Sequence, residues 1–407
     1  MKLALYLYFR RIVRSGLTQI DNGRPTLILA NHTNTFMDAI VMGMVLQRRI
    51  YFFTRGDMFR NKWADKILRS IGLLPVYRLS EGKENLYRND TSNEEAMDIL
   101  RKGGAVIIYG EGGSDMAKIL RPLKKGPFRL AVMAANELDQ APLMVPIGIN
   151  YTQPGAAFTS LYLQAGQAIE TQHLQGLDDT GRSRAALQLM RQVSQELAPL
   201  TWHTTDAENA LLADQLLALQ EQVHRPSFSD TQALLTRINA MNADETAVLK
   251  QQVADFLVWK DKLQLDNAPV ATATHLRTVI LLLLGALPAA AAWLFHWLPI
   301  KISKRIADKK VKEVDFYSSV FLSCAVGLTM IWYIISFVIF TLLFHAWIGL
   351  VLLLGLALAG IFYLKAYRLS MLQAWAAYRS KRLRQSRPKE WEQFHALQRV
   401  LLDFVKV

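Results

Sequence analysis

The stretch Ala30-Asn31-His32-Thr33-Asn34-Thr35-Phe36-Met37-Asp38 joins an apolar, β-prone run, Pro25–Leu29, to a second apolar run with helical character. It therefore predicts a strand-to-helix corner that carries a histidine and an aspartate. Because His32 and Asp38 are six residues apart, they can meet only if His32 lies in the turn and Asp38 in the first helical turn. Thr35 as N-cap, with Asp38 at the third helical position, would build this corner. An acid that only stabilises a helix N-terminus would give the same pattern.

From residue 25 to about residue 166, short apolar runs alternate with longer helical patterns. This alternation is typical of an α/β domain whose helices pack on a buried sheet. The polar motifs follow the runs, at the edge where open α/β sheets place their sites. The expected strands are Thr26–Ala30, Ile50–Thr54, Leu74–Tyr77, Ala105–Tyr109, Leu143–Ile149 and Leu161–Ala165.

The 407 residues are too many for one ordinary domain. We expect an α/β fold with a central mixed sheet flanked by helices over residues 25–170, and a helical subdomain over 171–276. Residues 277–407 should form an α-helical membrane region with a basic tail. Residues 1–24 predict a basic amphipathic helix on the membrane surface, with Leu3, Leu5, Leu7 and Tyr8 available to lipid. An ordinary helix packed on the domain fits equally well, and a secretory signal is not expected.

Three apolar tracts near the end of the chain, Thr278–Leu298, Phe316–Phe344 and Ala346–Leu364, are each long enough to cross a bilayer. If all three crossed, the α/β domain would lie opposite the two basic segments, which the positive-inside rule places in the cytoplasm. We therefore expect the first tract to be broken at Pro288 into a re-entrant or interfacial segment. The other two tracts would then form a two-span hairpin.

The composition excludes several classes of function. The net charge of +13 could indicate nucleic acid, but no nucleic-acid motif accompanies it, and many basic residues flank apolar tracts, as expected beside anionic membrane lipids. The single cysteine, Cys324, lies in an apolar tract, so neither an intramolecular disulfide nor a thiol nucleophile is expected. No metal-ligand spacing is visible, and no cofactor is expected.

Four motifs in order resemble the blocks of the glycerolipid acyltransferases that acylate glycerol 3-phosphate or lysophosphatidic acid. The nearest subgroup has an Asn-His-x-Asn first block. After Asn31–Asp38 the blocks are Arg55–Asn61 with Gly72–Arg78, then Ile107–Ser114, then Val145–Ile149. Two departures stand out. Five residues separate His32 from Asp38, where the commonest family spacing is four, and the third block lacks the Pro and the Arg of Phe-Pro-Glu-Gly-Thr-Arg.

The resemblance implies roles for individual residues. His32 would be the general base and Asp38 the residue that orients it, since imidazole titrates near neutrality. Arg78, and more weakly Arg55, would grip a phosphate. The remaining candidates are substrate contacts at Glu111, Gly112, Gly113, Ser114, Lys124 and Arg129, and an acyl-pocket or structural role for Pro146.

The expected function is a membrane-bound acyltransferase of phospholipid synthesis. Its donor would be acyl-CoA or acyl carrier protein, and its acceptor glycerol 3-phosphate, slightly favoured, or lysophosphatidic acid or another lysophospholipid. The expected location is a bacterial inner membrane, with the catalytic domain in the cytoplasm. A lipid-binding or scaffolding membrane protein that kept the fold without catalysis is the alternative, and an acyl-transfer assay distinguishes the two.

Overall fold

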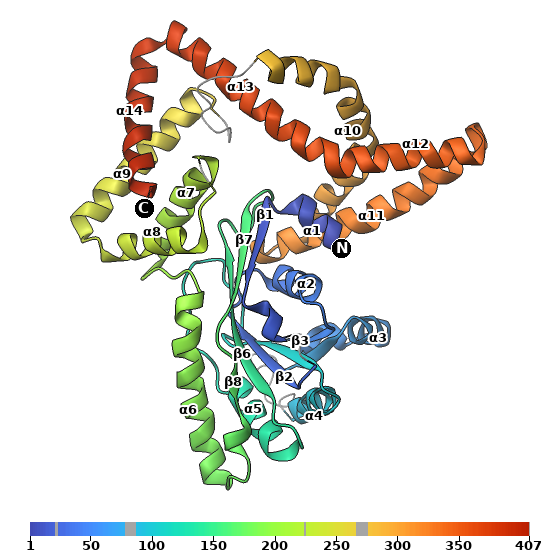
Figure 1. Ribbon diagram of the computed structural model, residues 1–407, viewed down its shortest axis with the longest axis vertical. Helices are drawn as coiled ribbons and strands as arrows, with labels where there is room; N and C mark the ends of the chain where they lie inside the picture. Colours follow the sequence, from blue (N-terminus) through green and yellow to red (C-terminus); the bar gives the residue numbers. More distant parts are fainter. Residues whose placement is uncertain (21–22, 78–86, 224, 266–275, 407) are drawn as a thin grey trace.

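The computed structural model describes residues 1–20, 23–77, 87–223, 225–265 and 276–406. Figure 1 shows an α/β unit, a group of helices beside one end of its sheet, and a long helical hairpin that projects away from both. The fold class expected from the sequence is confirmed. The mixed sheet and its flanking helices hold the candidate catalytic residues, and long apolar helices follow later in the chain.

The sheet is mixed and has eight described strands, in the order β1-β7-β6-β2-β5-β3-β4, with β8 paired to β6. Strands β2, β5, β3 and β4 run parallel, and β7 and β8 are antiparallel to β6. Every strand expected from the sequence is present within two residues of its predicted ends. The strands are β1 (Arg11–Ser15), β2 (Thr26–Ala30), β3 (Ile50–Arg55), β4 (Leu73–Val76), β5 (Ala105–Tyr109), β6 (Leu143–Tyr151), β7 (Ser160–Ala165) and β8 (Ile169–Glu170).

Both faces of the central strands are buried, which explains their continuous apolar sequences. One core lies between the sheet and the helices α1 (Lys2–Tyr8), α2 (Thr35–Val45) and α3 (Lys62–Ser70). The other core lies under α4 (Arg88–Arg101), α5 (Gly126–Glu137) and α6 (Asp179–Leu197). Short 3-10 turns connect some of these elements: η1 (Leu17–Ile20), η2 (Gly56–Phe59), η5 (Gln172–Leu174) and η6 (Ala198–Leu200).

The N-terminal segment packs on the domain. The prediction of an amphipathic surface helix exposes Leu5 and Tyr8 to lipid. In the structure both are buried in the core between the sheet and helices α1, α2 and α3, which is called the α2-side core below. The helix ends at Tyr8, and β1, which the sequence did not predict, follows it and pairs with β7. The helix therefore packs on the domain through Leu5 and Tyr8, while Leu3 is 43% exposed on its outer side, so lipid contact through that side stays a prediction.

The helices after the sheet form two packing groups, where one helical subdomain was expected. Helix α6 lies against the sheet, while a separate core joins α7 (Ala207–Val223), α8 (Phe228–Ala240), α9 (Ala243–Lys262) and α14 (Pro388–Val405). Helix α14 comes from the far end of the chain and buries Trp391, Phe394 and Leu401. The C-terminal segment is therefore a folded part of this helical group and not only a basic tail.

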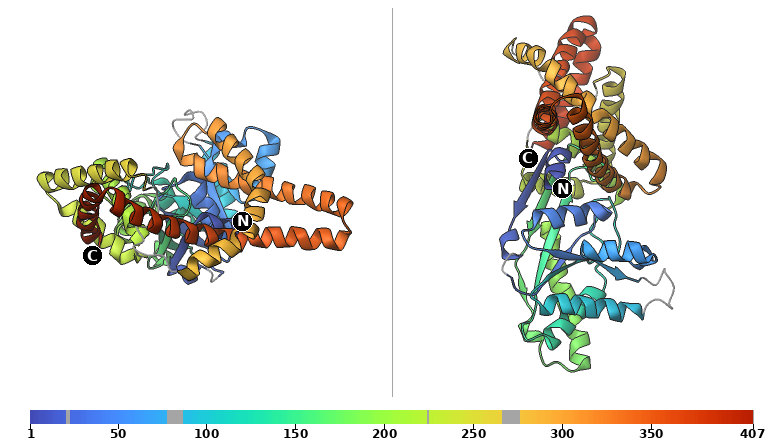
Figure 2. Two further views of the ribbon diagram at one scale, coloured as in Figure 1. Left: turned by 90° about the horizontal axis from the view of Figure 1, so that it is seen from above. Right: turned by 90° about the vertical axis from the view of Figure 1, so that its right-hand side faces the viewer.

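Among the residues that the structure describes, three helices are long and apolar enough to cross a membrane. They are α10 (Leu276–Lys310), α11 (Val314–Leu343) and a continuous helix made of α12 (Ala346–Leu358), the π-helical turn η7 (Ala359–Tyr363) and α13 (Leu364–Ser386). Helices α11 and α12 form the projecting hairpin, as Figures 1 and 2 show from different sides.

The predicted break at Pro288 is wrong. Helix α10 continues through Pro288 and Pro299 and is drawn in Figure 1 as a curved helix. A proline removes one backbone hydrogen bond and bends a helix, but neighbouring helices can tolerate the bend. Here α10 packs on its neighbours, where the hydroxyl of Tyr363 donates to the carbonyl oxygen of Gly285 at 2.9 Å. The chain at these prolines is therefore curved but still helical.

Candidate active site

The carboxyl ends of the parallel strands β2, β5 and β3 lie at one edge of the sheet, where His32 and Glu111 follow β2 and β5 and Arg55 ends β3. The corner after β2 is a tight turn into α2. Its N-cap is Asn34, one residue earlier than expected, and Thr35 already begins the helix with a φ of 26°. The side chain of Asn34 makes no capping hydrogen bond to the first turn of the helix. Instead, the carboxylate of Asp38 accepts hydrogen bonds from the backbone N–H groups at the start of the corner.

The side chain of Asp38 is completely buried and accepts four hydrogen bonds. Its Oδ2 accepts from the backbone N–H groups of Thr33 and Asn34, at 3.0 and 2.9 Å, and from His32 Nδ1 at 2.8 Å. Its Oδ1 accepts from the hydroxyl of Tyr151 in β6, at 2.6 Å. Four donors satisfy a buried carboxylate in its charged form, which would otherwise be costly to bury.

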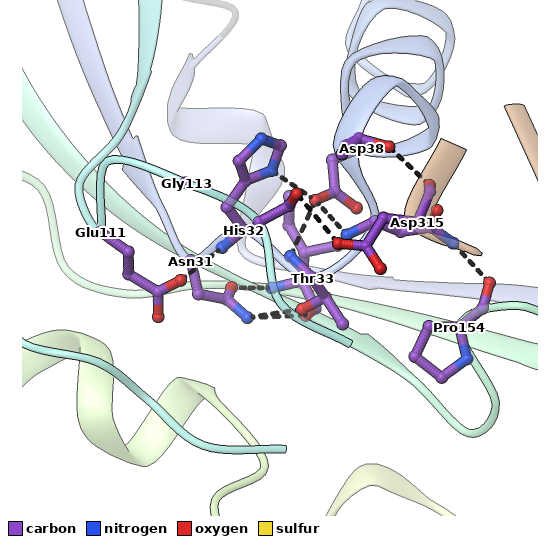
Figure 3. Close-up of polar contacts among 12 residues, drawn as sticks. Asn31, His32, Thr33, Asp38, Glu111, Gly113, Pro154 and Asp315 are labelled. Carbon is purple, nitrogen blue, oxygen red and sulfur yellow. Dashed lines mark hydrogen bonds and ion pairs between the residues drawn. The ribbon is translucent and has the colours of Figure 1, made fainter. Parts of the chain in front are cut away.

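The ring of His32 points at Asp38, as Figure 3 shows. One face of the His32 ring stacks on the ring of Tyr109 at the end of β5, with ring centroids 3.8 Å apart and 9° between the planes. The side chain is 14% exposed. Because the Asp38 carboxylate only accepts hydrogen bonds, Nδ1 carries the proton of a neutral ring, and Nε2 presents a lone pair.

The two tyrosines beside this pair stay protonated. Burial, and secondly the negative charge of Asp38, raise the pKa of both Tyr109 and Tyr151 well above the usual value of 10. Tyr151 therefore acts as a hydrogen-bond donor to Asp38 at any pH near neutrality. The ring of Tyr109 and the hydroxyl of Tyr151 together fix the orientation of the histidine–aspartate pair.

The carboxylate of Glu111 accepts hydrogen bonds from other groups of the protein. Its buried carboxylate accepts from the backbone N–H of His32 at 3.2 Å, and from the backbone N–H of Arg121 at 3.1 Å. The guanidinium of Arg121 donates to the same carboxylate at 2.9 Å and also to the carbonyl oxygen of Gly113. Glu111 therefore links the loop after β5 to the backbone of the histidine, and Arg121 closes that loop.

The loop Glu111–Ser114 turns sharply because Gly112 adopts a φ of 74°, a conformation that favours glycine. The hydroxyl of Ser114 donates to the carboxylate of Asp315, in the first turn of α11, at 3.3 Å. The hydroxyl of Thr35 donates to the carbonyl oxygen of the same Asp315 at 2.6 Å. The first turn of α11 thus touches both the corner after β2 and the loop after β5, and Figure 3 draws Asp315 beside Asp38.

The other residues singled out from the sequence are more scattered. Arg55 lies two strands away from His32 and pairs with Asp57 at 2.8 Å. The stem of Lys124 covers Gly112, while Arg129 is exposed on α5. Pro146 lies in the middle of β6 between two residues of the α2-side core, so its ring faces the opposite side of the sheet, near Gly166. Arg78 lies outside the described residues.

A narrow cleft opens beside the catalytic corner. It is lined by the loop after β5, by the backbone around His32 and by the turn after η6, with Lys118 on its wall. The ammonium of Lys118 is buried, and it donates to the carbonyl oxygen of Thr152 at 3.1 Å and to Asp214 of α7. Within the described residues, no group of three or more His, Cys, Asp or Glu side chains could hold a metal ion.

Four residues at the site were not predicted from the sequence: Tyr109, Arg121, Tyr151 and Asp315. Tyr109 ends a predicted strand and Arg121 follows the third block, so both lie near quoted motifs. Tyr151 and Asp315 are more than 100 residues beyond His32 in the chain, and no local pattern connects them with it. Only the folded arrangement brings them to the corner.

Comparisons with known proteins agree with the blocks. Residues 11–150 match the family model described as Acyltransferase. No curated protein matches the chain. Among solved structures, it is similar to the crystal structure of the 1-acyl-sn-glycerophosphate (LPA) acyltransferase PlsC from Thermotoga maritima, with 17% identity and a TM-score of 0.32 over 47% of this chain and 74% of that one. The matched segment contains the His32–Asp38 corner and the three later blocks, so residues 11–150 are similar to an acyltransferase domain.

Proposed function

We propose that this protein is a membrane-bound O-acyltransferase with His32 and Asp38 as its catalytic pair. It would transfer a fatty acyl group from acyl-CoA or acyl carrier protein to a hydroxyl of glycerol 3-phosphate or lysophosphatidic acid. One observation carries this proposal: a fully buried Asp38 holds His32 Nδ1 at 2.8 Å and leaves Nε2 unbonded within the described residues. A scaffold has no need for a buried carboxylate aimed at a histidine.

In this mechanism Nε2 of His32 takes the proton of the acceptor hydroxyl as its oxygen attacks the thioester carbonyl. Asp38 stabilises the imidazolium that forms. When the tetrahedral intermediate collapses, the carbon–sulfur bond breaks and His32 returns the proton to the departing sulfur. The nucleophile is the substrate's own alcohol, so no serine or cysteine of the enzyme is acylated.

The turn Gly112–Ser114 is the proposed site for the negatively charged oxygen of the intermediate. The N–H of Gly112 already donates to the carbonyl oxygen of Tyr109 at 3.2 Å, so the proposed donors are the backbone N–H groups of Gly113 and Ser114. They follow β5 at the same sheet edge as His32, and preorganised donors of this kind stabilise an oxyanion. Glu111 would hold this turn in place and would not bind substrate, because its oxygens already accept from His32 and Arg121.

For the acceptor phosphate we propose Arg78, with Arg55 and the exposed Lys124 and Arg129 as further candidate cations. An arginine can hold a phosphate through paired hydrogen bonds. Arg121 is a candidate for the arginine that the third block lacks. Its guanidinium reaches the carbonyl oxygen of Gly113 from seven residues beyond Ser114.

We further propose that the hairpin of α11 and α12 crosses the membrane, so that the catalytic domain and α14 lie on the same, cytoplasmic side. Single cysteines in a Cys324→Ser background, placed near Lys309, His345 and Arg382, can be labelled on intact cells with an impermeant reagent. Only the position at His345, between the two hairpin helices, should react. Labelling near Lys309 or Arg382 would contradict the proposed orientation.

The catalytic proposal is tested by an acyl-transfer assay on purified membranes, with glycerol 3-phosphate, lysophosphatidic acid, other lysophospholipids and acyl-glycerol as acceptors. His32→Ala should lower transfer by about 10²–10⁴-fold, as expected for the loss of a general base. His173→Ala, at an exposed position outside the site, is the matched control. Near-normal turnover in His32→Ala would refute the mechanism, and no transfer to any acceptor by the unchanged protein would favour the scaffold.

A further inference from the structure

Helix α3 presents a row of large apolar side chains that the protein does not cover. Trp63, Ile67 and Ile71 follow one another at intervals of four residues, so the row runs along one side of the helix. Ile71 is the C-cap residue, directly after the last helical residue, Ser70. They are 76%, 59% and 62% exposed. A single exposed apolar residue needs no explanation, but a row of three on one helix face marks a surface that contacts something apolar.

Basic side chains border this row. Arg60, Lys62 and Lys66 are all exposed, and within the described residues none of them has an ion-pair or hydrogen-bond partner for its side chain. Among the other charged side chains of α3, Arg69 pairs with Asp65 at 2.7 Å and also with Glu95 of α4. The free face of α3 is therefore apolar along its centre and positively charged along its border.

The helix is held firmly in this orientation. The side chain of Asn61 caps it by accepting from the backbone N–H of Trp63 at 2.9 Å. On the inner side Leu68 packs against the α2-side core, and the guanidinium of Arg69 lies 5.6 Å from the ring centroid of Phe59. The apolar row thus faces outward because the opposite face of α3 is fixed to the domain.

The position of α3 indicates what covers the row. In Figure 1, α3 lies on the right-hand side of the α/β unit, the side toward which the hairpin of α11 and α12 extends. The view from above in Figure 2 agrees with this placement. A bilayer that receives the hairpin would therefore be on the side of the molecule where α3 lies. Tryptophan with lysines beside it is also the composition typical of the membrane–water interface.

We propose that α3 is a second membrane contact, separate from the long apolar helices. It would lie in the headgroup layer of an anionic bilayer, with Trp63, Ile67 and Ile71 inserted and Lys62 and Lys66 on lipid phosphates. This contact does not depend on the acyl acceptor or on catalysis. Its consequence for the enzyme is positional, because η2 and Arg55 immediately precede α3 and would be held at the bilayer surface.

The test uses the full chain in nanodiscs of phosphatidylcholine and phosphatidylglycerol, with an environment-sensitive fluorophore on a single cysteine. The labelled variants are Ile67→Cys and, as matched control, Leu211→Cys, both in the Cys324→Ser background. Leu211 is 62% exposed on α7, on the other side of the molecule. Circular dichroism checks that each labelled variant keeps its helical content.

An interfacial helix buries its apolar face about 5–10 Å into the headgroup boundary. A nitroxide lipid quencher just below the glycerol level should therefore remove roughly half or more of the Ile67 fluorescence, whereas the Leu211 probe should keep its signal. Replacing Lys62 and Lys66 by glutamine, or leaving out the phosphatidylglycerol, should reduce the quenching.

Equal quenching of the Ile67 and Leu211 probes would overturn the proposal. So would an Ile67 probe that is protected from aqueous iodide but untouched by the lipid quencher, because a protein would then cover the row. Quenching that does not change with lipid charge or with the lysine substitutions would refute the part assigned to the basic border. None of these measurements uses enzyme activity, so failure of the acyltransferase proposal would not affect them.

Discussion

Replacing Asp38 by asparagine removes the charge of the site while keeping its shape. The asparagine oxygen can take the place of Oδ2 and accept from Thr33, Asn34 and His32, and its NH₂ group can donate to the Tyr151 hydroxyl, which rotates to accept. The corner should therefore fold normally. What is lost is the negative charge that stabilises the imidazolium, and we expect a fall in turnover of about 10²–10⁴-fold.

The alanine variant at the same position should behave differently. Asp38→Ala leaves the N–H groups of Thr33 and Asn34 and the hydroxyl of Tyr151 buried without an acceptor. Each unsatisfied group costs about 1–3 kcal/mol, so the free energy of unfolding should fall by several kcal/mol along with the activity.

Acyl-transfer assays and denaturant unfolding in the same detergent measure both quantities, with Asp139→Asn, at an exposed position, as the control. Asparagine and alanine variants that lose stability equally would refute this reasoning, as would an asparagine variant with normal turnover.

Three further outcomes follow from the packing. Gly148→Ala should prevent stable folding, because a Cβ there would lie 1.8 Å from a backbone carbonyl oxygen, whereas Gly155→Ala should fold, since its nearest neighbour is 3.7 Å away; yield and thermal unfolding distinguish them. The raised pKa of Tyr109 and Tyr151 means that the unfolded chain releases protons near pH 10 that the folded protein keeps. The free energy of unfolding should therefore decrease as the pH rises above about 10, less steeply after Tyr109→Phe. Arg121→Gln should lower turnover about tenfold or more by loosening the turn after β5, a loss of about 1.4 kcal/mol in the transition state; unchanged kinetics would show that this arginine does not shape the site.

The strands with two buried faces could be predicted from the sequence because their side chains are apolar without interruption. Strand β1 was missed for the opposite reason. It contains Arg11 and Arg14 and has no buried residue, and it forms because its backbone pairs with β7. The side chain of Arg11 then donates to the hydroxyl of Tyr162. A strand that depends on its partner for stability leaves little trace in its own sequence.

The long helix α10 shows the limit of a local rule. Pro288 is unfavourable inside an isolated helix, by about 3 kcal/mol. Contacts with α11 and α13 outweigh that cost: His296 of α10 lies 2.8 Å from the hydroxyl of Tyr333, and the hydroxyl of Tyr367 donates to the carbonyl oxygen of Leu282. Such contacts lie far apart in the chain, so the sequence around Pro288 could not reveal them.

The contact between His32 and Asp38 at a strand-to-helix corner could be predicted because it is local: both residues and the turn between them lie within seven residues. The groups that support it were not. Tyr151 comes from β6 and Asp315 from α11, and each reaches the corner only after the sheet and the hairpin are in place. A motif can thus indicate candidate reacting groups, whereas the residues that orient them depend on the whole fold.

The match to residues 11–150 suggests a module that could be excised and studied alone, but the first turns of α11 argue against this. The hydroxyl of Ser318 donates to the side-chain oxygen of Asn34 at 2.9 Å, Leu322 is buried in the α2-side core, and the carbonyl oxygen of Asp315 accepts from Thr35. A fragment that ends before Val314 would keep the sheet and lose these contacts. Thr35, with its unusual positive φ, would no longer be held. Such a fragment is expected to fold and yet to present its histidine in a loosened loop, so its inactivity would say nothing about the chemistry of the intact chain.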